Sequence, residues 1–343
     1  MSSPSELLES LKARGVSLFS QGDRLLRLRL AAGRGFSEAT LLPHRLHGEE
    51  GLSVNYRYDL ECLSANAHLE LKTLLGQPVE VGLLLPDGGE RLLTGLVTRA
   101  EQLGADGGFA RYRLTIEPAL ATLAHRRNSR VYQDKSVPAI VEALLTEHRE
   151  RNPAFLASFT WRNDLTQTYP VRSYCLQYRE SDLAFITRLL AEEGISWRYT
   201  HGPDPDTAPP GEAGARAGGG AASGSASGRT SGDAAETDAG AGVPVHTLIL
   251  FDRQTVLPSN PLQQVRFHRT DGVEADDAVD VWEGTRQIQS GQTSLASYDY
   301  KAVSVHTGGE TSRTDQGSVG TALSDGLEDY DPQTLYYGSD PDE

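Results

Sequence analysis

Two neighbouring glutamates, Glu192 and Glu193, are the first candidates for chemistry in this 343-residue chain. A pair of carboxylates in one cleft could serve as general acid and general base. Both residues fall near the end of a predicted helix, where adjacent side chains point about 100° apart and do not face each other. The pair therefore favours a solvated helix end over a catalytic centre.

Residues 271–284, DGVEADDAVDVWEG, are similar at first sight to a calcium-binding loop. Such a loop needs oxygen ligands at its third and fifth positions, but these are Val273 and Ala275. The sixth position, which needs glycine for a sharp turn, is Asp276. The segment does not predict a calcium site.

Other reactive patterns are absent from the sequence. No Cys-x-x-Cys or His-Glu-x-x-His occurs, and the glycines at 218–220 do not lead into a Gly-Lys-Ser or Gly-Lys-Thr turn. Without a signal peptide, Cys62 and Cys175 are expected to be buried free thiols rather than a disulfide. His148 is expected to be a surface residue at a helix end. We expect no enzymatic activity, no cofactor and no metal.

Charge is distributed unevenly along the chain. Residues 1–200 hold 24 Lys and Arg against 24 Asp and Glu, whereas residues 201–343 hold 8 against 23. An acidic half would repel phosphates, so we expect no nucleic-acid partner. No apolar run is long enough to span a bilayer and the N-terminus does not resemble a secretion signal, so we expect no stable membrane insertion and a cytoplasmic start.

The glutamate pair is positioned by residues 172–199, which predict a strand, a helix and a second strand. Unlike side chains alternate over residues 174–179, as in a strand with two different faces. Ser181 stands where a helix N-cap belongs, Asp182 follows in the first turn, and Gly194 stands where a helix ends. The helix has an apolar face of roughly 160°, which consists of Leu183, Phe185, Ile186, Leu189 and Leu190.

Strands dominate the rest of the chain, which predicts a mainly β fold with a few short helices. Predicted strands occupy 24–30, 52–60, a hairpin over 79–100, 110–118, 245–252, 262–269, 278–288 and 294–303, and predicted helices occupy 69–75 and 137–150. Residues 203–242 are rich in Gly, Ala and Ser, and they predict a disordered insert. The strands on either side of this insert are expected to pair.

Residues 172–199 closely resemble a signature of VgrG proteins, the spike components of bacterial type VI secretion systems. The similar residues are Gln177, Tyr178, Arg179, Glu180, Ser181, Asp182, Phe185, Arg188, Leu189, Leu190, Glu192, Glu193, Gly194 and Ile195. The resemblance continues upstream in LLGQPVEVGL and TGLVT, and downstream in HTLILFD. It covers roughly residues 20–300, in the order of the family.

The resemblance implies tandem β-barrels of the contractile-phage tail-hub type, with three chains forming a ring of six barrels. It implies a first hub barrel over 1–125, helices and strands of the second barrel region over 126–202, the insert over 203–242, the remaining hub strands over 243–302, and an acidic, turn-rich segment over 303–343. No internal repeat is visible in the sequence, so the duplicated barrel rests on the resemblance.

The same resemblance implies that the signature is scaffold. Its structural residues are then Gln177, Tyr178, Glu180, Phe185, Arg188 and Gly194. The helix would bury its apolar face against a barrel, and Arg188 and Glu180 are candidates for an ion pair.

The implied function is a structural hub, a homotrimer that caps an Hcp-type tube hexamer, contacts baseplate components and carries an effector or adaptor. Family members continue into a spike that would contact a PAAR tip, and this chain stops at Glu343, about where that spike would begin. Assembly in the cytoplasm followed by secretion is the implied route. The alternatives are the tail hub of a phage or tailocin, and the hub region of a VgrG protein that carries a toxin enzyme elsewhere.

Overall fold

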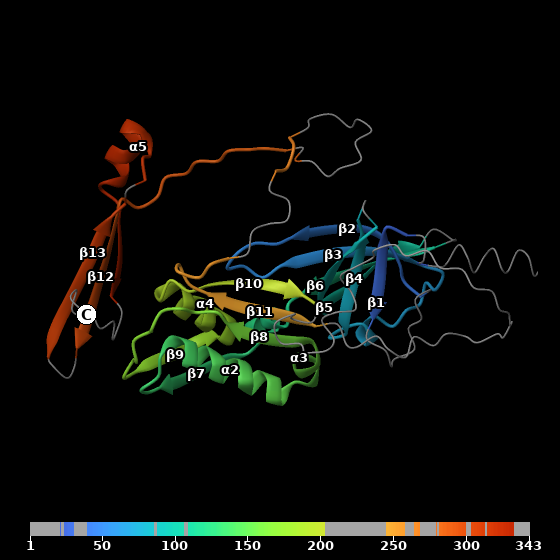
Figure 1. Ribbon diagram of the computed structural model, residues 1–343, viewed down its shortest axis with the longest axis horizontal. Coiled ribbons are helices and arrows are strands. Elements are labelled where there is room, and N and C mark those ends of the chain that lie inside the picture. The colour runs from blue at the N-terminus through green and yellow to red at the C-terminus, as the bar shows by residue number, and fades with distance from the viewer. Residues whose placement is uncertain are drawn as a thin grey trace, which may run out of the picture. The chain divides into compact units, whose positions relative to one another are not determined.

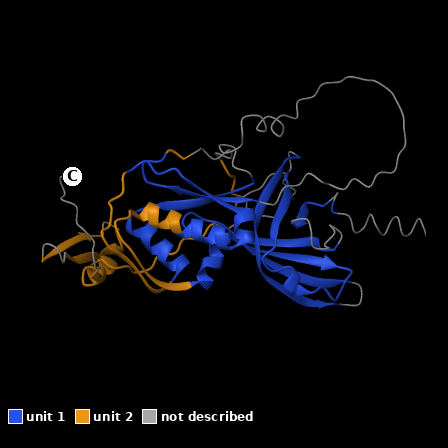
Figure 2. Cartoon of the chain, turned by 90° about the horizontal axis from the view of Figure 1, so that it is seen from below, with its two compact units in different colours: residues 1–126, 144–167, 181–255 blue, residues 127–143, 168–180, 256–343 orange. Residues whose placement is uncertain are grey.

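The computed structural model describes two compact units, each considered separately (Figure 2). Unit 1 comprises residues 1–126, 144–167 and 181–255, and unit 2 comprises residues 127–143, 168–180 and 256–343. The described residues are 21, 24–30, 40–85, 88–105, 109–202, 245–257, 264–267, 279, 281–299, 303–312 and 314–332. The predicted insert at 203–242 and most of the loop at 271–284 lie outside them. The predicted domain boundaries remain a prediction.

Unit 1 begins with a six-stranded antiparallel sheet (Figure 1). In spatial order its strands are β1 (Leu26–Leu30), β4 (Pro78–Leu84), β5 (Glu90–Ala105), β6 (Ala110–Glu117), β3 (Arg57–Ser64) and β2 (Leu42–Glu49). The sheet curls so that its two edges lie close together. The Arg24 guanidinium, just before β1, donates to the Pro43 carbonyl oxygen of β2 at 3.4 Å. The Gln21 side chain also donates to the Leu41 carbonyl oxygen at 3.3 Å.

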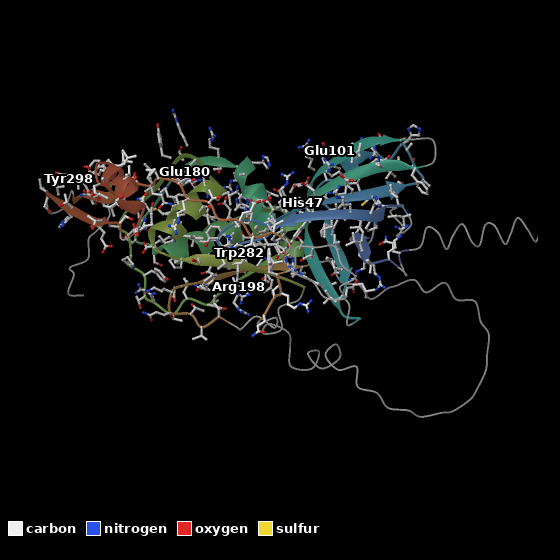
Figure 3. The ribbon with its side chains drawn as sticks, turned by 90° about the horizontal axis from the view of Figure 1, so that it is seen from above. His47, Glu101, Glu180, Arg198, Trp282 and Tyr298 are labelled. Carbon is white, nitrogen blue, oxygen red and sulfur yellow. The ribbon has the colours of Figure 1, made fainter. Side chains whose placement is uncertain are left out.

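Alternating side chains fill the inside of this sheet. Tyr58, Leu60 and Cys62 of β3 are each at most 2% exposed, and they pack with buried residues of β4, β5 and β6. On the outer face, Glu61 lies opposite Arg113, which in turn lies opposite Glu101. Figure 3 labels Glu101 on this sheet. The predicted strands at 24–30 and 110–118 and the 79–100 hairpin are confirmed here, whereas the strand predicted at 52–60 begins only at Arg57, as β3, and β2 was not predicted. The helix predicted at 69–75 is only a 3₁₀ turn, η1 (Leu71–Thr73).

Within the described residues of unit 1, a three-stranded sheet forms the rest of the β structure. Its order is β10 (Ser196–His201), β11 (His246–Phe251) and β8 (Phe159–Asn163). β10 and β11 are antiparallel with His201 opposite His246, which confirms the predicted pairing of these strands. β11 runs parallel to β8.

Short helices accompany this second sheet. They are η2 (Ala119–His125), α3 (Pro153–Ser158), α4 (Asp182–Glu192) and the part of α2 (Val137–Arg151) that belongs to unit 1. Among the described residues, no helix combines the length and apolar character that crossing a bilayer requires. The prediction of a mainly β fold with short helices is confirmed.

Unit 2 contains two smaller sheets. β7 (Arg127–Tyr132) pairs with β9 (Cys175–Ser181), and β12 (Gln292–Asp299) lies between β13 (Ser304–Thr311) and β14 (Glu328–Pro332). Helix α5 (Gly317–Ser324) lies between β13 and β14 in the sequence. The acidic C-terminal segment therefore contains more regular structure than its turn-rich composition indicated.

Two strand predictions in unit 2 are wrong. The described part of the strand predicted at 262–269, residues 264–267, contains no strand. Residues 281–290 have no regular secondary structure, although 278–288 alternate like a strand. The described backbone forms only an isolated bridge there, between Val279 and Phe267. The side chains of Val281 and Trp282 are 63% and 83% exposed, so neither side of the alternating pattern is buried there.

Candidate functional site

The signature segment starts helix α4 with a side-chain cap. The Ser181 hydroxyl accepts a hydrogen bond from the Ala184 N–H at 3.1 Å, which satisfies one of the free donors of the first turn. Phe185, Ile186, Leu189 and Leu190 are each at most 1% exposed, and Leu183 is half-buried. The predicted cap and apolar face are confirmed.

A left-handed glycine ends the same helix. Gly194 has φ of +65°, and its N–H donates to the Ala191 carbonyl oxygen at 3.2 Å. The Ile195 N–H donates to the Leu190 carbonyl oxygen at 2.8 Å. This pair of bonds is a Schellman motif, in which buried Ile195 and Leu190 accompany the turn. The chain is thereby directed into β10.

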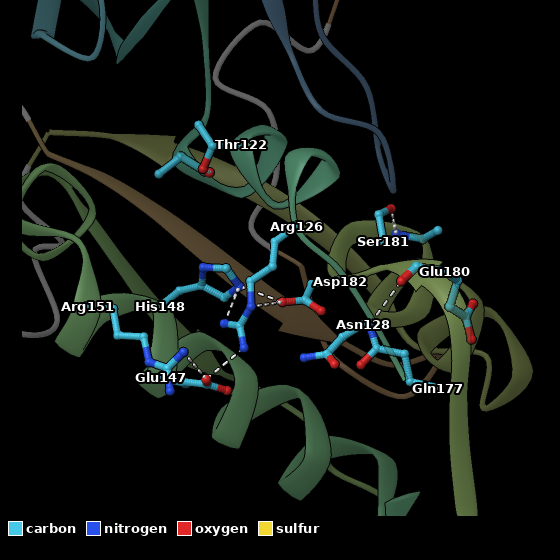
Figure 4. Close-up of polar contacts among 12 residues, drawn as sticks. Thr122, Arg126, Asn128, Glu147, His148, Arg151, Gln177, Glu180, Ser181 and Asp182 are labelled. Atoms are coloured by element: carbon cyan, nitrogen blue, oxygen red, sulfur yellow. Dashed lines mark hydrogen bonds and ion pairs between the residues drawn. The ribbon is translucent and has the colours of Figure 1, made fainter. Parts of the chain in front are cut away.

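A buried polar network fixes the start of α4 to two other segments of unit 1 (Figure 4). The Asp182 side chain is fully buried, and its Oδ2 accepts from His148 Nε2 at 2.8 Å and lies 3.4 Å from Arg126 Nε. Arg126 also donates to Glu147 Oε1 at 2.7 Å. The Asp182 N–H donates to the Arg126 carbonyl oxygen at 2.9 Å. A buried carboxylate needs such partners to offset its lost hydration.

His148 corrects an expectation drawn from the sequence. Its side chain is 13% exposed and belongs to this network, so it is not a surface residue at a helix end. Helical spacing already placed it on the face of Ile140, Val141 and Leu144, which are fully buried. A polar residue on a buried face requires a hydrogen-bond partner, and this was the available signal. No local pattern pointed to Arg126 or Glu147.

The predicted signature residues divide between the two units. Phe185 and Gly194 support α4 in unit 1, where the Arg188 guanidinium lies 5.3 Å from the centre of the Phe185 ring. Arg188 also pairs with Glu192 at 2.6 Å, and the Arg188 to Glu180 pair remains a prediction.

In unit 2, the signature residues lie along β9. Gln177 is fully buried, and its amide donates to the Glu180 carbonyl oxygen at 3.2 Å. Tyr178 is 61% exposed. Strand β9 therefore buries Cys175 and Gln177, although the alternate residues Leu176 and Tyr178 are the more apolar ones.

Two histidines, His201 half-buried and His246 fully buried, lie at the ends of the paired strands β10 and β11. His201 Nδ1 accepts from the Thr94 N–H at 3.0 Å, so its Nε2 carries the proton and donates to the Tyr58 hydroxyl at 3.2 Å. His246 Nε2 accepts from the Ala119 N–H at 2.8 Å. Burial lowers the pKa of His201 to about 4, and burial, followed by the neighbouring His201, lowers the pKa of His246 to about 3.

A cavity of about 270 Å³ opens beside His201 and is lined by Glu50, Gly51, Leu52, Tyr56, Arg198 and Tyr199. Both ring nitrogens of His201 are already bound within the protein, so neither is free to accept a proton from a substrate. The Tyr199 hydroxyl is likewise bound, to the Asn55 side chain at 2.6 Å. These polar groups hold the two sheets of unit 1 together.

The two carboxylates first considered for catalysis, Glu192 and Glu193, have structural roles in helix α4. Glu192 is paired with Arg188, and Glu193 is the C-cap residue of α4. Over the described ranges, no group of three or more His, Cys, Asp and Glu side chains gathers as a metal site requires. Cys62 and Cys175 are both buried and free, as expected.

Residues 49–343 match the family described as phage tail baseplate hub (GPD). The type VI secretion system spike protein VgrG4b of Pseudomonas aeruginosa is 43% identical over 154 residues, which cover 45% of this chain and 18% of that protein. The actin cross-linking toxin VgrG1 of Vibrio cholerae is 31% identical over 176 residues, which cover 49% of this chain and 15% of that protein. The match thus spans less than a fifth of either relative.

A solved structure of the E. coli c3393 protein, described as a type VI secretion component similar to T4 bacteriophage tail proteins gp27 and gp5, aligns with a TM-score of 0.46. The alignment has 24% identity and covers 66% of this chain and 49% of that one. The sequence matches confirm the resemblance to VgrG proteins.

Proposed function

Because the chain belongs to the phage tail baseplate hub family, we propose that it is the structural hub of a type VI secretion spike. In this role it caps the secretion tube and provides the base on which effectors or adaptors are carried. The observation that carries the proposal is the family match over residues 49–343, which includes four of the six strands of the first sheet of unit 1 and all of its second sheet.

The internal chemistry of the signature supports a scaffold. Asp182, His148 and Arg126 neutralise one another inside the protein, and Ser181 and Gly194 cap the two ends of one helix. Each of these polar groups is engaged with another part of the chain. We therefore propose that the signature residues position α4 and perform no catalysis.

The partners follow from the hub role. We propose a homotrimer that binds an Hcp-type tube hexamer and baseplate components, and that reaches a PAAR tip only through a spike domain. Assembly takes place in the cytoplasm, and the assembled spike is then secreted by the type VI system.

The test measures the mass of the full chain and its capture by a purified Hcp-type tube hexamer immobilised on beads. We expect a trimer by light scattering and retention on the hexamer. Glu70→Gln, which changes an exposed side chain in unit 1, is the control and should be retained equally. A chain that stays monomeric at high concentration and passes the hexamer beads unretained contradicts the proposal.

A second candidate function is a hub whose parent protein also carries a toxin enzyme, which the Vibrio cholerae relative favours by its name. We propose that this chain supplies only the hub. Purified chain should therefore leave actin monomers uncross-linked and peptidoglycan, lipid and nucleic acid uncleaved. Cross-linking or cleavage that disappears in Glu192→Gln or Glu193→Gln would assign the enzyme to this chain instead.

A further inference from the structure

The β7–β9 strand pair in unit 2 carries exposed basic and aromatic side chains. Arg127 and Val131 of β7 are exposed, as are Tyr178 and Arg179 of β9. Val131 is 49% exposed and Tyr178 is 61% exposed. No acidic side chain stands among the fully exposed residues of these two strands. We call Arg127, Val131, Tyr178 and Arg179 the basic face.

Backbone geometry holds two neighbouring members of this face outward. Arg179 has φ of +52°, an uncommon conformation for a residue with a side chain. The break in alternation leaves both Tyr178 and Arg179 exposed, where a regular strand would bury one of them. The Arg179 N–H donates to the Ser129 hydroxyl at 3.2 Å, which helps to fix this conformation.

The tyrosine and the arginine are already arranged as a pair. The Arg179 guanidinium carbon lies 5.3 Å from the centre of the Tyr178 ring, within the range of a cation–π contact. Tyr and Arg are among the residues most enriched at the energetic centres of protein interfaces. A side-chain pair that is ordered before binding loses less entropy when a partner arrives. The basic face therefore has the composition and order of a docking surface for an acidic protein segment.

The same chain provides an acidic segment of matching character. All five residues of β14, Glu328–Pro332, are exposed. They include the carboxylates of Glu328, Asp329 and Asp331, and Tyr330 is 58% exposed. Among the described strands β14 pairs only with β12, so it is an edge of its sheet. Edge strands are common sites of association with another chain.

We propose that the basic face of one copy binds strand β14 of a second copy, with Arg127 and Arg179 opposite Glu328 and Asp329. The two surfaces are different and opposite in charge, so the contact is head to tail. Head-to-tail contacts between identical chains generate closed rings when the rotation permits. The inference rests on the proposed function in one respect, which is that a hub assembles with itself.

Charge reversal tests this contact in the full chain. Arg127→Glu with Arg179→Glu makes the basic face acidic, and Glu328→Lys with Asp329→Lys makes β14 basic. Each double variant alone should raise the dissociation constant of the assembly at least about tenfold in sedimentation velocity, because like charges then meet. A variant that carries all four substitutions should restore assembly, since its two surfaces are again opposite in charge.

Two controls separate this contact from general effects of charge or folding. Arg45→Glu with Arg111→Glu makes the same change in charge at exposed positions of the six-stranded sheet and should leave assembly unchanged. Raising the salt concentration from about 50 mM to about 500 mM should weaken the wild-type assembly and should have less effect on the variants. Rescue by the variant with all four substitutions also excludes misfolding, because a chain misfolded by one charge reversal is not refolded by a second one.

Cysteine cross-linking gives an independent measurement. Tyr178→Cys in a tagged copy and Tyr330→Cys in an untagged copy should form a disulfide between the two chains on a non-reducing gel, because Cys62 and Cys175 are buried. Wild-type trimers that persist in both charge-reversed variants would overturn the proposed contact and leave the hub function standing. The absence of this cross-link between copies that do assemble would also overturn it. A wild type that remains monomeric would overturn both proposals.

Discussion

The imidazole of His148 donates to the buried carboxylate of Asp182 across 2.8 Å, which joins the end of α2 to the first turn of α4. The aspartate oxygen that accepts this bond also lies 3.4 Å from Arg126 Nε. Three segments that are distant in the sequence thus meet at one carboxylate. The position of the signature helix depends on this meeting point.

Asp182→Ala should lower the free energy of unfolding by about 3 kcal/mol, because it leaves Arg126 and His148 without their buried acceptor. The measurement is urea unfolding followed by circular dichroism. Glu70→Gln removes a carboxylate that is 60% exposed and pairs with Lys72, and it should change stability by less than about 1 kcal/mol. Equal losses in the two variants would show that the network contributes nothing specific.

Gly194→Ala should cost about 1 kcal/mol, because a residue with a side chain is strained at the φ of +65° that this position requires. Gly284 is the matched control, since its backbone is not left-handed and an added methyl group would meet no neighbouring atom. Gly284→Ala should therefore leave the melting temperature unchanged. Unchanged stability in both variants would mean that the Schellman motif is dispensable.

His201 and His246 predict a dependence of stability on pH. Unfolded histidine has a pKa of about 6.5, whereas burial lowers the pKa of His201 to about 4 in the folded protein. The unfolded chain therefore binds more protons below about pH 6.5, and stability is lost as the pH falls toward 4. Each such histidine contributes a slope of up to about 1.4 kcal/mol per pH unit.

His201→Gln should reduce this slope, because its amide can still accept from the Thr94 N–H but does not titrate. Urea unfolding between about pH 7 and pH 5 measures the slope. His47→Gln, at an exposed position of β2, is the control and should keep the wild-type slope. A slope that is the same in all three proteins would exclude His201 as its source.

Replacing residues 203–242 with Asn-Gly should leave the fold unchanged or slightly more stable. The flanking strands are already paired from Ser196 with Phe251 to His201 with His246, and a short turn fixes the register of a hairpin well. The melting temperature and the secretion of the full-length parent are the two measurements. A large drop in melting temperature would show that the segment is packed structure, and lost secretion at unchanged stability would show a docking segment.

The sequence contained enough local information to predict the elements around the signature. Ser181 and Gly194 mark the two ends of α4, and the spacing of Phe185, Ile186 and Leu189 defines its buried face. The same local rules failed at residues 278–288, where alternation indicated a strand but the described backbone at 281–290 is irregular. A strand needs a pairing partner, and alternation alone does not show whether one is present.

The polar network of Asp182, His148 and Arg126 could be predicted only in part, because local sequence does not show which segments meet in the fold. Helical spacing placed His148 on a buried face, but the identity of its partner depends on how α2, α4 and the residue after η2 meet. The orientation of β9 is a further case, because Gln177 is buried while Tyr178 is exposed. The sequence of a strand with two unlike faces does not show which face is covered by another part of the protein.

The order of strands in the second sheet of unit 1 has a consequence during synthesis. β11 lies between β10 and β8, yet it is the last of the three to leave the ribosome. The six-stranded sheet is complete once residue 117 has emerged, whereas β8 and β10 must wait for residues 246–251. At ~5–20 residues per second, the chain between β10 and the end of β11 imposes a delay of roughly 3–10 s. The length of that intervening segment therefore determines how long β8 and β10 remain accessible to chaperones before β11 is synthesised and covers them.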